Sequence, residues 1–190
     1  KDIYTLQDVR KPEILEKLLV ALALQIGSEV SYNELARTVQ TDVKTVERYI
    51  NLLEKCFIIF KLNGLNRNMR NELKKTKKIF FYDIGIRNAL IQNFLQLNLR
   101  NDIGALWENF FIAERLKFNN YHNRFAKMYF WRTQQQQEID LVEESEGKFV
   151  AYEMKWNETR KASFPKSFIE AYNPINANII TPKNYINFLM

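Results

Sequence analysis

The chain has 190 residues, of which 46% are hydrophobic and 26% charged, with five glycines and four prolines, so a disordered chain is excluded and one or two globular domains are expected. No run of about 18 uncharged apolar residues occurs, which excludes a transmembrane helix. Cys56 is the only cysteine and His122 the only histidine, so an internal disulfide is excluded, zinc or Ser-His chemistry is disfavoured, and a cytoplasmic setting is expected.

The net charge of +6 is concentrated in the first part of the chain. Residues 1–78 hold 15 Lys and Arg against 10 Asp and Glu, whereas residues 79–190 hold 13 against 12. The segment Lys61–Lys78 carries seven basic residues against Glu72 alone. It predicts either contacts to phosphate backbones or a solvated loop. The candidate nucleic-acid residues in it are Arg67, Arg70, Lys74, Lys75, Lys77 and Lys78.

Three helices are predicted in the first part of the chain. Glu13–Gln25 has apolar residues at helical spacing and follows a proline, which is common at helix starts. Ser31 and Glu34 form a capping-box pattern that begins a short second helix. Asp42 is expected to cap the third helix, Val43–Lys55.

The second and third helices, joined by a short polar turn, predict a helix-turn-helix. Lys44, Thr45 and Arg48 lie in the first turns of the third helix, where major-groove contacts are made. Two apolar runs of β character, Phe57–Leu62 and Ile79–Tyr82, flank the basic segment and predict a wing. We therefore expect a winged helix over residues 1–82, which binds DNA or serves as a protein-interaction or dimerisation unit.

The second part, residues 83–190, predicts a short helix after Asp83 and then a longer helix, three strands, a helix and a strand. Glu108 lies on the longer helix. The strands are aromatic or alternate between apolar and polar residues. The expected elements are Gly104–Phe118, Lys127–Arg132, Glu138–Glu143, Phe149–Trp156, Ser163–Tyr172 and Ala177–Thr181.

Two of these strands bring acidic and basic residues together. A four-residue loop, Ser145–Lys148, sets a register in which Asp140 lies directly across from Glu153. Lys155 follows two residues later and so lies on the same face as Glu153. This grouping is either a metal-dependent catalytic site or a plain ion pair, and a slip of one residue in the register would separate its members.

The order of elements, with Asp140 followed by Glu153-Met154-Lys155, resembles the PD-(D/E)XK nuclease superfamily. The whole chain also resembles the uncharacterised domain family found downstream of the ATPase module in many prokaryotic AAA-type ATPases. Family members often have glycine before the Glu-x-Asp pattern, where this chain has Gln134–Gln137. The matching pieces are Asn33–Ala36, Thr45–Ile50, Lys78–Gly85, Trp107–Phe110, Phe130–Arg132 and Glu138–Val142.

The resemblance implies an α+β or α/β chain: a winged helix, then a restriction-endonuclease-like αβββαβ domain over residues 83–190. It implies Mg²⁺ bound by Glu108, Asp140 and Glu153, with the Met154 carbonyl as a further ligand. Asp140, Glu153 and Lys155 would form the catalytic site of a DNA endonuclease, with Lys155 orienting or deprotonating water or neutralising phosphate charge.

The alternative is a non-catalytic module that binds DNA or a protein and regulates the attached ATPase. No phosphate-binding G-x-x-x-x-G-K-[ST] loop occurs, so ATP would bind only in a missing N-terminal part. The chain opens on Lys1, which suggests a fragment of a longer protein. The expected partners are DNA, the protein's own ATPase domain and further copies of the chain.

Overall fold

The structure is a computed structural model that describes residues 9, 11–65, 77–159 and 163–190. The described residues combine helices with a mixed sheet, which confirms the expected mixed α/β class. They divide into two compact units, with divisions after Lys61 and after Leu99. The first unit holds residues 9, 11–61 and 77–99, and the second holds 62–65, 100–159 and 163–190.

The helices of the first unit follow the prediction closely. They are α1 (Pro12–Leu24), α2 (Tyr32–Thr38), α3 (Val43–Lys55) and α5 (Ile84–Leu90). The predicted caps of α2 and α3 are confirmed by hydrogen bonds to side chains, whereas α1 begins without a side-chain cap. The Ser31 hydroxyl accepts from the Glu34 N–H at 3.4 Å, and the Asp42 carboxylate accepts from the Thr45 N–H at 2.8 Å. Such caps satisfy N–H groups that have no partner within the helix.

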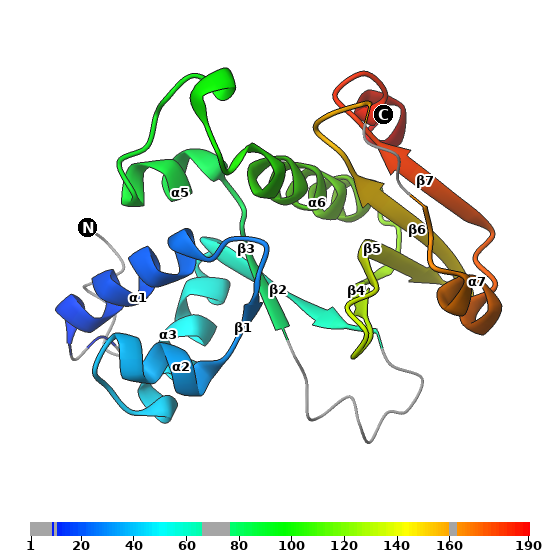
Figure 1. Cartoon of the computed structure of the whole chain (residues 1–190). Coiled ribbons are helices and arrows are strands. Elements are labelled where there is room, and N and C mark those ends of the chain that lie inside the picture. Colours follow the sequence, from blue (N-terminus) through cyan, green and yellow to red (C-terminus); the bar gives the residue numbers. More distant parts are fainter. Residues whose placement is uncertain (1–8, 10, 66–76, 160–162) are drawn as a thin grey trace. The chain divides into compact units, whose positions relative to one another are not determined.

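Three strands accompany these helices (Figure 1): β1 (Glu29–Val30), β2 (Ile59–Gly64) and β3 (Lys77–Phe81). The strand order is β1-β3-β2, and β1 pairs antiparallel with β3. The two predicted strands are confirmed with shifted ends, whereas the two-residue β1 was not predicted. Buried aromatic and leucine side chains form the core of this unit, among them Tyr49, Leu53, Phe80 and Phe81.

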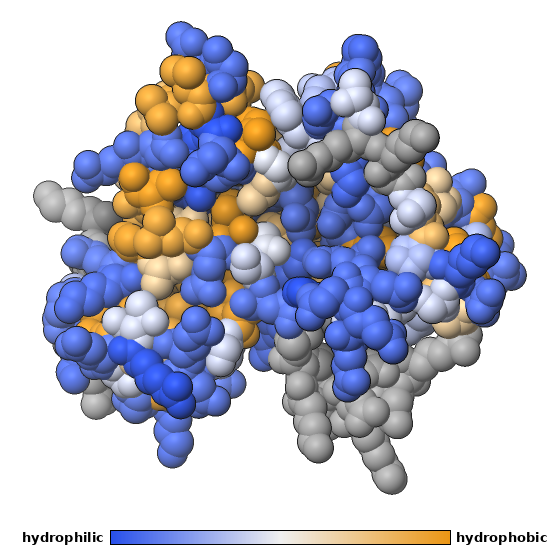
Figure 2. Space-filling view, viewed as in Figure 1, coloured by the Kyte–Doolittle hydropathy of each residue, from blue (hydrophilic) through white to orange (hydrophobic). Residues whose placement is uncertain are grey.

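An uncharged segment follows α5. No Lys, Arg, Asp or Glu occurs from Asn88 to Leu99, which includes the short 3-10 helix η2 (Leu97–Leu99). Phe94 is 72% exposed and Leu99 is 64% exposed. Figure 2 shows apolar side chains gathered at the upper left, over α5 and the segment after it. No helix in the described part of the chain is long and apolar enough to cross a membrane.

The second unit is built on β4 (Lys127–Arg132), β5 (Glu138–Ser145), β6 (Lys148–Met154) and β7 (Asn176–Ile180), in the order β2-β4-β5-β6-β7. The β4–β5 and β5–β6 pairs are antiparallel, and the β6–β7 and β2–β4 pairs are parallel. The helices are α6 (Ile103–Tyr121), α7 (Lys166–Tyr172) and the 3-10 helix η3 (Tyr185–Phe188).

The predicted register of the β5–β6 hairpin is confirmed, but the predicted loop length is wrong. Leu141 pairs with Tyr152 and Ser145 pairs with Lys148, as the register requires. The turn is therefore two residues long, Glu146-Gly147, instead of four. Both turn residues have positive φ, 51° and 74°, because a two-residue turn of this kind matches the right-handed twist of the strands.

Helices α6 and α7 cover opposite faces of this sheet. Arg115 of α6 bonds to Glu143, whereas Phe168 of α7 packs with Val142. Val142 and Glu143 are neighbours on β5, and neighbouring strand residues point to opposite faces of a sheet. The α7 face holds the buried cluster, which contains Trp131 at 6% exposure. The other buried members are Ile139, Val142, Ala151 and Phe168.

Phe168→Ala should lower the free energy of unfolding by about 3–5 kcal/mol, because it empties the centre of the α7-face cluster. Its matched control is Ile169→Ala on the same helix, where the side chain is 38% exposed and the expected loss is about 1 kcal/mol or less. Urea denaturation of both variants measures the difference. Equal losses would contradict the packing described for this face.

Candidate functional site

Asp140 lies at an irregularity of β5. Tyr129 pairs with Val142 and Trp131 pairs with Ile139, so two steps along β4 match three steps along β5. The extra residue of β5 therefore falls between Ile139 and Val142, where Asp140 stands. Such bulges re-aim side chains and are frequent beside active sites. The Met154 N–H of β6 donates to Oδ2 of Asp140 at 2.8 Å, which orients the carboxylate.

Glu153 and Lys155 are in direct contact. Nζ of Lys155 donates to Oε2 of Glu153 at 2.7 Å, and Glu153 is only 7% exposed. Burial, together with the nearby charge of Asp140, raises the pKa of Glu153 to about 7, against the opposing effect of Lys155. The structure thus brings Asp140, Glu153 and Lys155 together at the end of the hairpin.

Lys155 stays protonated in this setting. Burial would lower its pKa, but the hydrogen bond and charge of Glu153, with the charges of Asp140 and Glu108, raise the pKa above its ordinary value. The three carboxylates therefore act on one ammonium group. At neutral pH Lys155 is a fixed positive charge and not a free amine.

A cavity of about 560 Å³ adjoins these residues and is lined by Glu108 of α6, Asp140 and Lys155. Asn101 just before α6, Gly104 in its first turn, and Trp156 and Asn157 after β6 also line the cavity. Glu153 does not line it. Within the described residues, no three His, Cys, Asp or Glu side chains are close enough together to hold a metal ion. The predicted set Glu108, Asp140 and Glu153 is thus not a ready-made three-ligand cluster.

The predicted nucleic-acid residues of α3 lie on its outer face. Lys44 and Arg48 are exposed and line a groove of about 350 Å³ with Asn51 and Lys55. Thr45 is half-buried, and its hydroxyl donates to the Asp42 carboxylate at 2.7 Å. Lys44 and Arg48 are therefore available to a ligand, whereas the Thr45 hydroxyl is engaged in the helix cap.

The basic segment is described only at its end. Nζ of Lys77 lies 4.9 Å from the centre of the Tyr32 ring, a cation–π contact. Lys78 is 2% exposed, so its side chain is not on the surface. The predictions for Arg67, Arg70, Lys74 and Lys75 lie outside the described residues.

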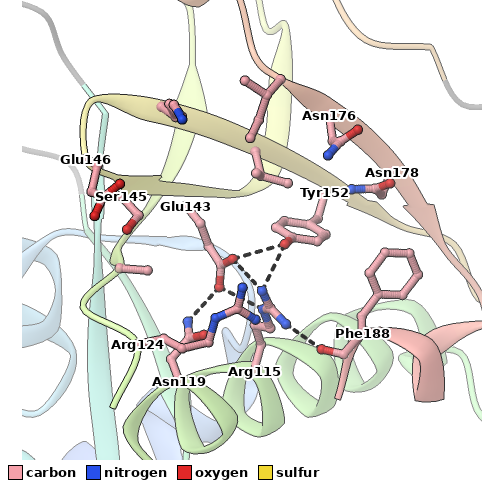
Figure 3. A pocket seen from close by; sticks show the side chains of 14 residues that line it. Arg115, Asn119, Arg124, Glu143, Ser145, Glu146, Tyr152, Asn176, Asn178 and Phe188 are labelled. Atoms are coloured by element: carbon pink, nitrogen blue, oxygen red, sulfur yellow. Dashed lines mark hydrogen bonds and ion pairs between the residues drawn. The ribbon is translucent and has the colours of Figure 1, made fainter. Parts of the chain in front are cut away.

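A second polar cluster on the α6 face was not predicted. Arg115 donates through Nε and Nη2 to the two carboxylate oxygens of Glu143, each at 2.8 Å, and through Nη1 to the Phe188 carbonyl. Asn119 and the Tyr152 hydroxyl also donate to Glu143, at 2.6 and 3.0 Å (Figure 3). One sequence signal was present: Arg115 and Asn119 are four residues apart and share a helix face.

The two buried carboxylates titrate in opposite directions. Burial alone would raise the pKa of Glu143, but the hydrogen bonds and charge of Arg115, with Asn119 and Tyr152, lower it below its ordinary value. Glu153 has a like charge beside it and one ammonium, whereas Glu143 has a bidentate guanidinium and two further donors. The Asp140–Glu153 site is thus the less neutralised of the two.

Two known protein families match different parts of the chain. Residues 1–100, more than half of the sequence, match a domain of unknown function (DUF8612). The chain belongs to the DUF8612 family. Residues 103–187 match a second domain of unknown function (DUF4143), which is found at the C-termini of ATPase-associated proteins. The junction between the two matches lies beside the division of the structure after Leu99.

This DUF8612 member has relatives in bacteria and an archaeon. Uncharacterized proteins of Mycobacterium tuberculosis and Mycobacterium bovis are each 31% identical over 144 residues, which is 75% of this chain and 32% of the relative. An uncharacterized protein of Methanocaldococcus jannaschii is 35% identical over 74 residues, 39% of this chain and 15% of that protein. The chain spans about a third of the length of the mycobacterial relatives. No solved structure matches it.

Glu143→Gln should lower the free energy of unfolding by about 3–5 kcal/mol at neutral pH, because it leaves the buried Arg115 guanidinium unpaired. The folded-state pKa of Glu143 is lowered, so its contribution is present above the ordinary value of 4.5 and is lost as pH falls through the folded pKa. The difference between wild type and variant should therefore shrink on acidification, measured by urea denaturation from about pH 8 to about pH 4.

Glu153→Gln is the matched comparison and should behave oppositely. A pKa raised from 4.5 to about 7 means that ionisation of Glu153 disfavours the folded state, so stability is greatest below pH 4.5 and falls as pH rises to 7. In EDTA, the stability of Glu153→Gln should not fall in this way as the pH rises. Near pH 8 the variant should therefore be more stable than the wild type. A Glu153→Gln variant that parallels Glu143→Gln would contradict the assigned electrostatics.

Proposed function

We propose that this chain is the DNA-directed C-terminal part of an AAA-type ATPase, with a winged helix that binds DNA and a PD-(D/E)XK-like unit that cleaves it with Mg²⁺. One observation carries the proposal: Asp140, Glu153 and Lys155 meet where β5 bulges and β6 ends, beside a cavity that Glu108 also lines. The match to a domain found at the C-termini of ATPase-associated proteins supports the ATPase part.

The arrangement of the first unit supports the winged-helix part of the proposal. Its elements follow the order α1, β1, α2, α3, β2, β3, with the strands ordered β1-β3-β2. Helices α2 and α3 form the helix-turn-helix, in which α3 would enter the major groove. Lys44 and Arg48 are exposed cations in the first turns of α3, and β2 and β3 flank the basic segment that would form the wing.

The arrangement of the second unit supports the nuclease-like part. Helix α6, strands β4, β5 and β6, helix α7 and strand β7 follow one another in the αβββαβ order. The antiparallel β4-β5-β6 set extends to a parallel β7, with α6 and α7 on opposite faces. The acidic pair then lies on β5 and β6, where the D…ExK pattern requires it.

The chemistry of the donor set fits Mg²⁺. This ion prefers hard oxygen ligands, keeps several waters and is often bound by one or two carboxylates with substrate phosphates. Asp140 and Glu153 would hold it, with the Met154 carbonyl as a further oxygen ligand, and Glu108 lies within electrostatic reach of the same site. When bound, the ion neutralises phosphate charge and lowers the pKa of a water ligand.

The protein's own residues have distinct parts in this proposal. The Met154 N–H orients Asp140 through Oδ2. Lys155 is an ammonium group because Glu153, Asp140 and Glu108 raise its pKa, and as a cation it would stabilise charge on the scissile phosphate. The cavity beside Asp140 and Lys155 provides the space for that phosphate.

A second candidate is a non-catalytic module that binds DNA or a protein and regulates the ATPase. The Lys155–Glu153 ion pair at 2.7 Å favours it, since the ammonium already occupies a carboxylate oxygen that a metal would need. The lack of a three-ligand cluster within the described residues points the same way. In this case Asp140 and Glu153 have a structural role only.

Calorimetric titration should show that the wild type binds Mg²⁺ or Mn²⁺. This binding should disappear in the double variant Asp140→Asn/Glu153→Gln, because each substitution removes a carboxylate ligand. Metal-dependent nicking of a plasmid should disappear in the same protein and in Lys155→Gln. The matched control is Glu144→Gln, which lies on β5 outside the site and should keep both activities. Wild-type protein that binds neither ion nor nicks DNA would establish the non-catalytic candidate.

Lys44→Ala/Arg48→Ala should weaken DNA binding and reduce its dependence on salt by about one unit of logarithmic slope for each lost phosphate contact. Fluorescence anisotropy on a duplex at several salt concentrations measures both effects. The control is Lys17→Ala, an exposed lysine on α1. DNA binding that does not depend on salt, or that Lys17→Ala weakens equally, would rule out α3 as the contact helix.

A further inference from the structure

A second cavity, of about 480 Å³, lies on the α6 face of the second unit. Its walls come from α6, the β5–β6 hairpin, the first part of β7 and the end of η3, as Figure 3 shows. None of the residues that line the Asp140 cavity lines this one. The size lies within the range of small-molecule sites in proteins.

The charged residues in this cavity do not all cancel. Arg115 and Glu143 neutralise each other through their bidentate pair. Arg124, just after α6, and Lys148, at the start of β6, also line the cavity, and within the described residues their side chains form no ion pair. Their neighbour Glu146 offsets one of the two charges, so the rim keeps an excess positive charge suited to an anionic group.

Amide side chains form the rest of the polar wall. Asn119 is 3% exposed, and its Oδ1 is a buried acceptor without a hydrogen-bond partner in the described structure, although its amide N–H donates to Glu143. Asn176 and Asn178 of β7 line the opposite side. Oδ1 of Asn119 is closed off from solvent, so the amides that a ligand can reach are those of the exposed Asn176 and the half-buried Asn178.

An aromatic surface completes the cavity. The rings of Tyr152 and Phe188 lie edge to face at 6.1 Å, and both residues line the cavity. The Tyr152 hydroxyl is already bonded to Glu143 and Arg115, and Tyr152 is only 3% exposed, so the half-buried ring of Phe188 is the aromatic surface that a ligand can reach. Aromatic rings stack well on nucleobases.

We propose that this cavity binds a nucleoside monophosphate, with the phosphate at Arg124 and Lys148 and the base edge at the amides of Asn176 and Asn178. Amide side chains pair with the donor and acceptor edge of a base, and two cations hold a phosphate as point charges. A base also fills the aromatic side of the cavity, which inorganic phosphate leaves empty. The site does not depend on the proposed nuclease activity.

Calorimetry on the whole chain in EDTA tests this with AMP, GMP, CMP and UMP as probes, and with inorganic phosphate and the four nucleosides as separate arms. At least one monophosphate should bind roughly tenfold more tightly than either inorganic phosphate or its own nucleoside, because both halves of the cavity are used. Binding of phosphate as tight as that of every nucleotide would overturn the base-binding half. No binding of any monophosphate would overturn the proposal.

Variants separate the two halves of the cavity. Arg124→Gln/Lys148→Gln should weaken monophosphate binding roughly tenfold and leave nucleoside binding unchanged, since only charge-assisted contacts are lost. Asn176→Ala/Asn178→Ala should remove the preference among bases and keep phosphate binding. The charge control is Lys127→Gln, an exposed lysine that does not line the cavity.

A last variant distinguishes this cavity from the Asp140 site. Asp140→Asn/Glu153→Gln should leave nucleotide affinity unchanged, whether or not the chain is a nuclease. Loss of binding in that variant, together with unchanged binding in Arg124→Gln/Lys148→Gln, would place the nucleotide in the other cavity and overturn the proposal. The unfolding midpoint of each variant shows whether it is folded.

Discussion

The buried Arg115–Glu143 ion pair joins four elements of the second unit. The guanidinium joins α6 to β5 through Glu143, to β6 through Tyr152 and to the end of η3 through the Phe188 carbonyl. A buried charge without a partner is costly, so these contacts hold only if α6 keeps one position along the strands. That position places Glu108, two helical turns before Arg115, beside the cavity at the ends of β5 and β6.

The same two strands therefore carry two kinds of acidic site. On the α6 face, Glu143 is surrounded by donors and its carboxylate is ionised and neutralised. At the strand ends, Asp140 and Glu153 share one ammonium group and keep an excess of negative charge. An unbalanced buried charge lowers stability and is typical of functional sites. The balanced charges around Glu143 stabilise the fold, whereas the unbalanced charges of Asp140 and Glu153 form the candidate functional site.

Local signals made much of this structure predictable, and long-range ones did not. Helix α3 was predicted with its correct ends because Asp42 caps it, and the β5–β6 register followed from a turn rich in turn-forming residues. The bulge at Asp140 depends on how β4 and β5 align with each other, and this alignment cannot be read from the sequence of either strand alone. The Arg115–Glu143 pair joins residues 28 positions apart and arises only when helix and sheet pack.

The two-residue turn Glu146-Gly147 has a bearing on how related chains can diverge. The turn is exposed and contacts neither Asp140 nor Glu153, so substitutions in it are tolerated if the backbone can keep φ positive. A change in its length is different, because one added residue would shift every β5–β6 partner and turn Glu153 to the other face. Among relatives, the length of this distant turn should therefore vary less than its composition.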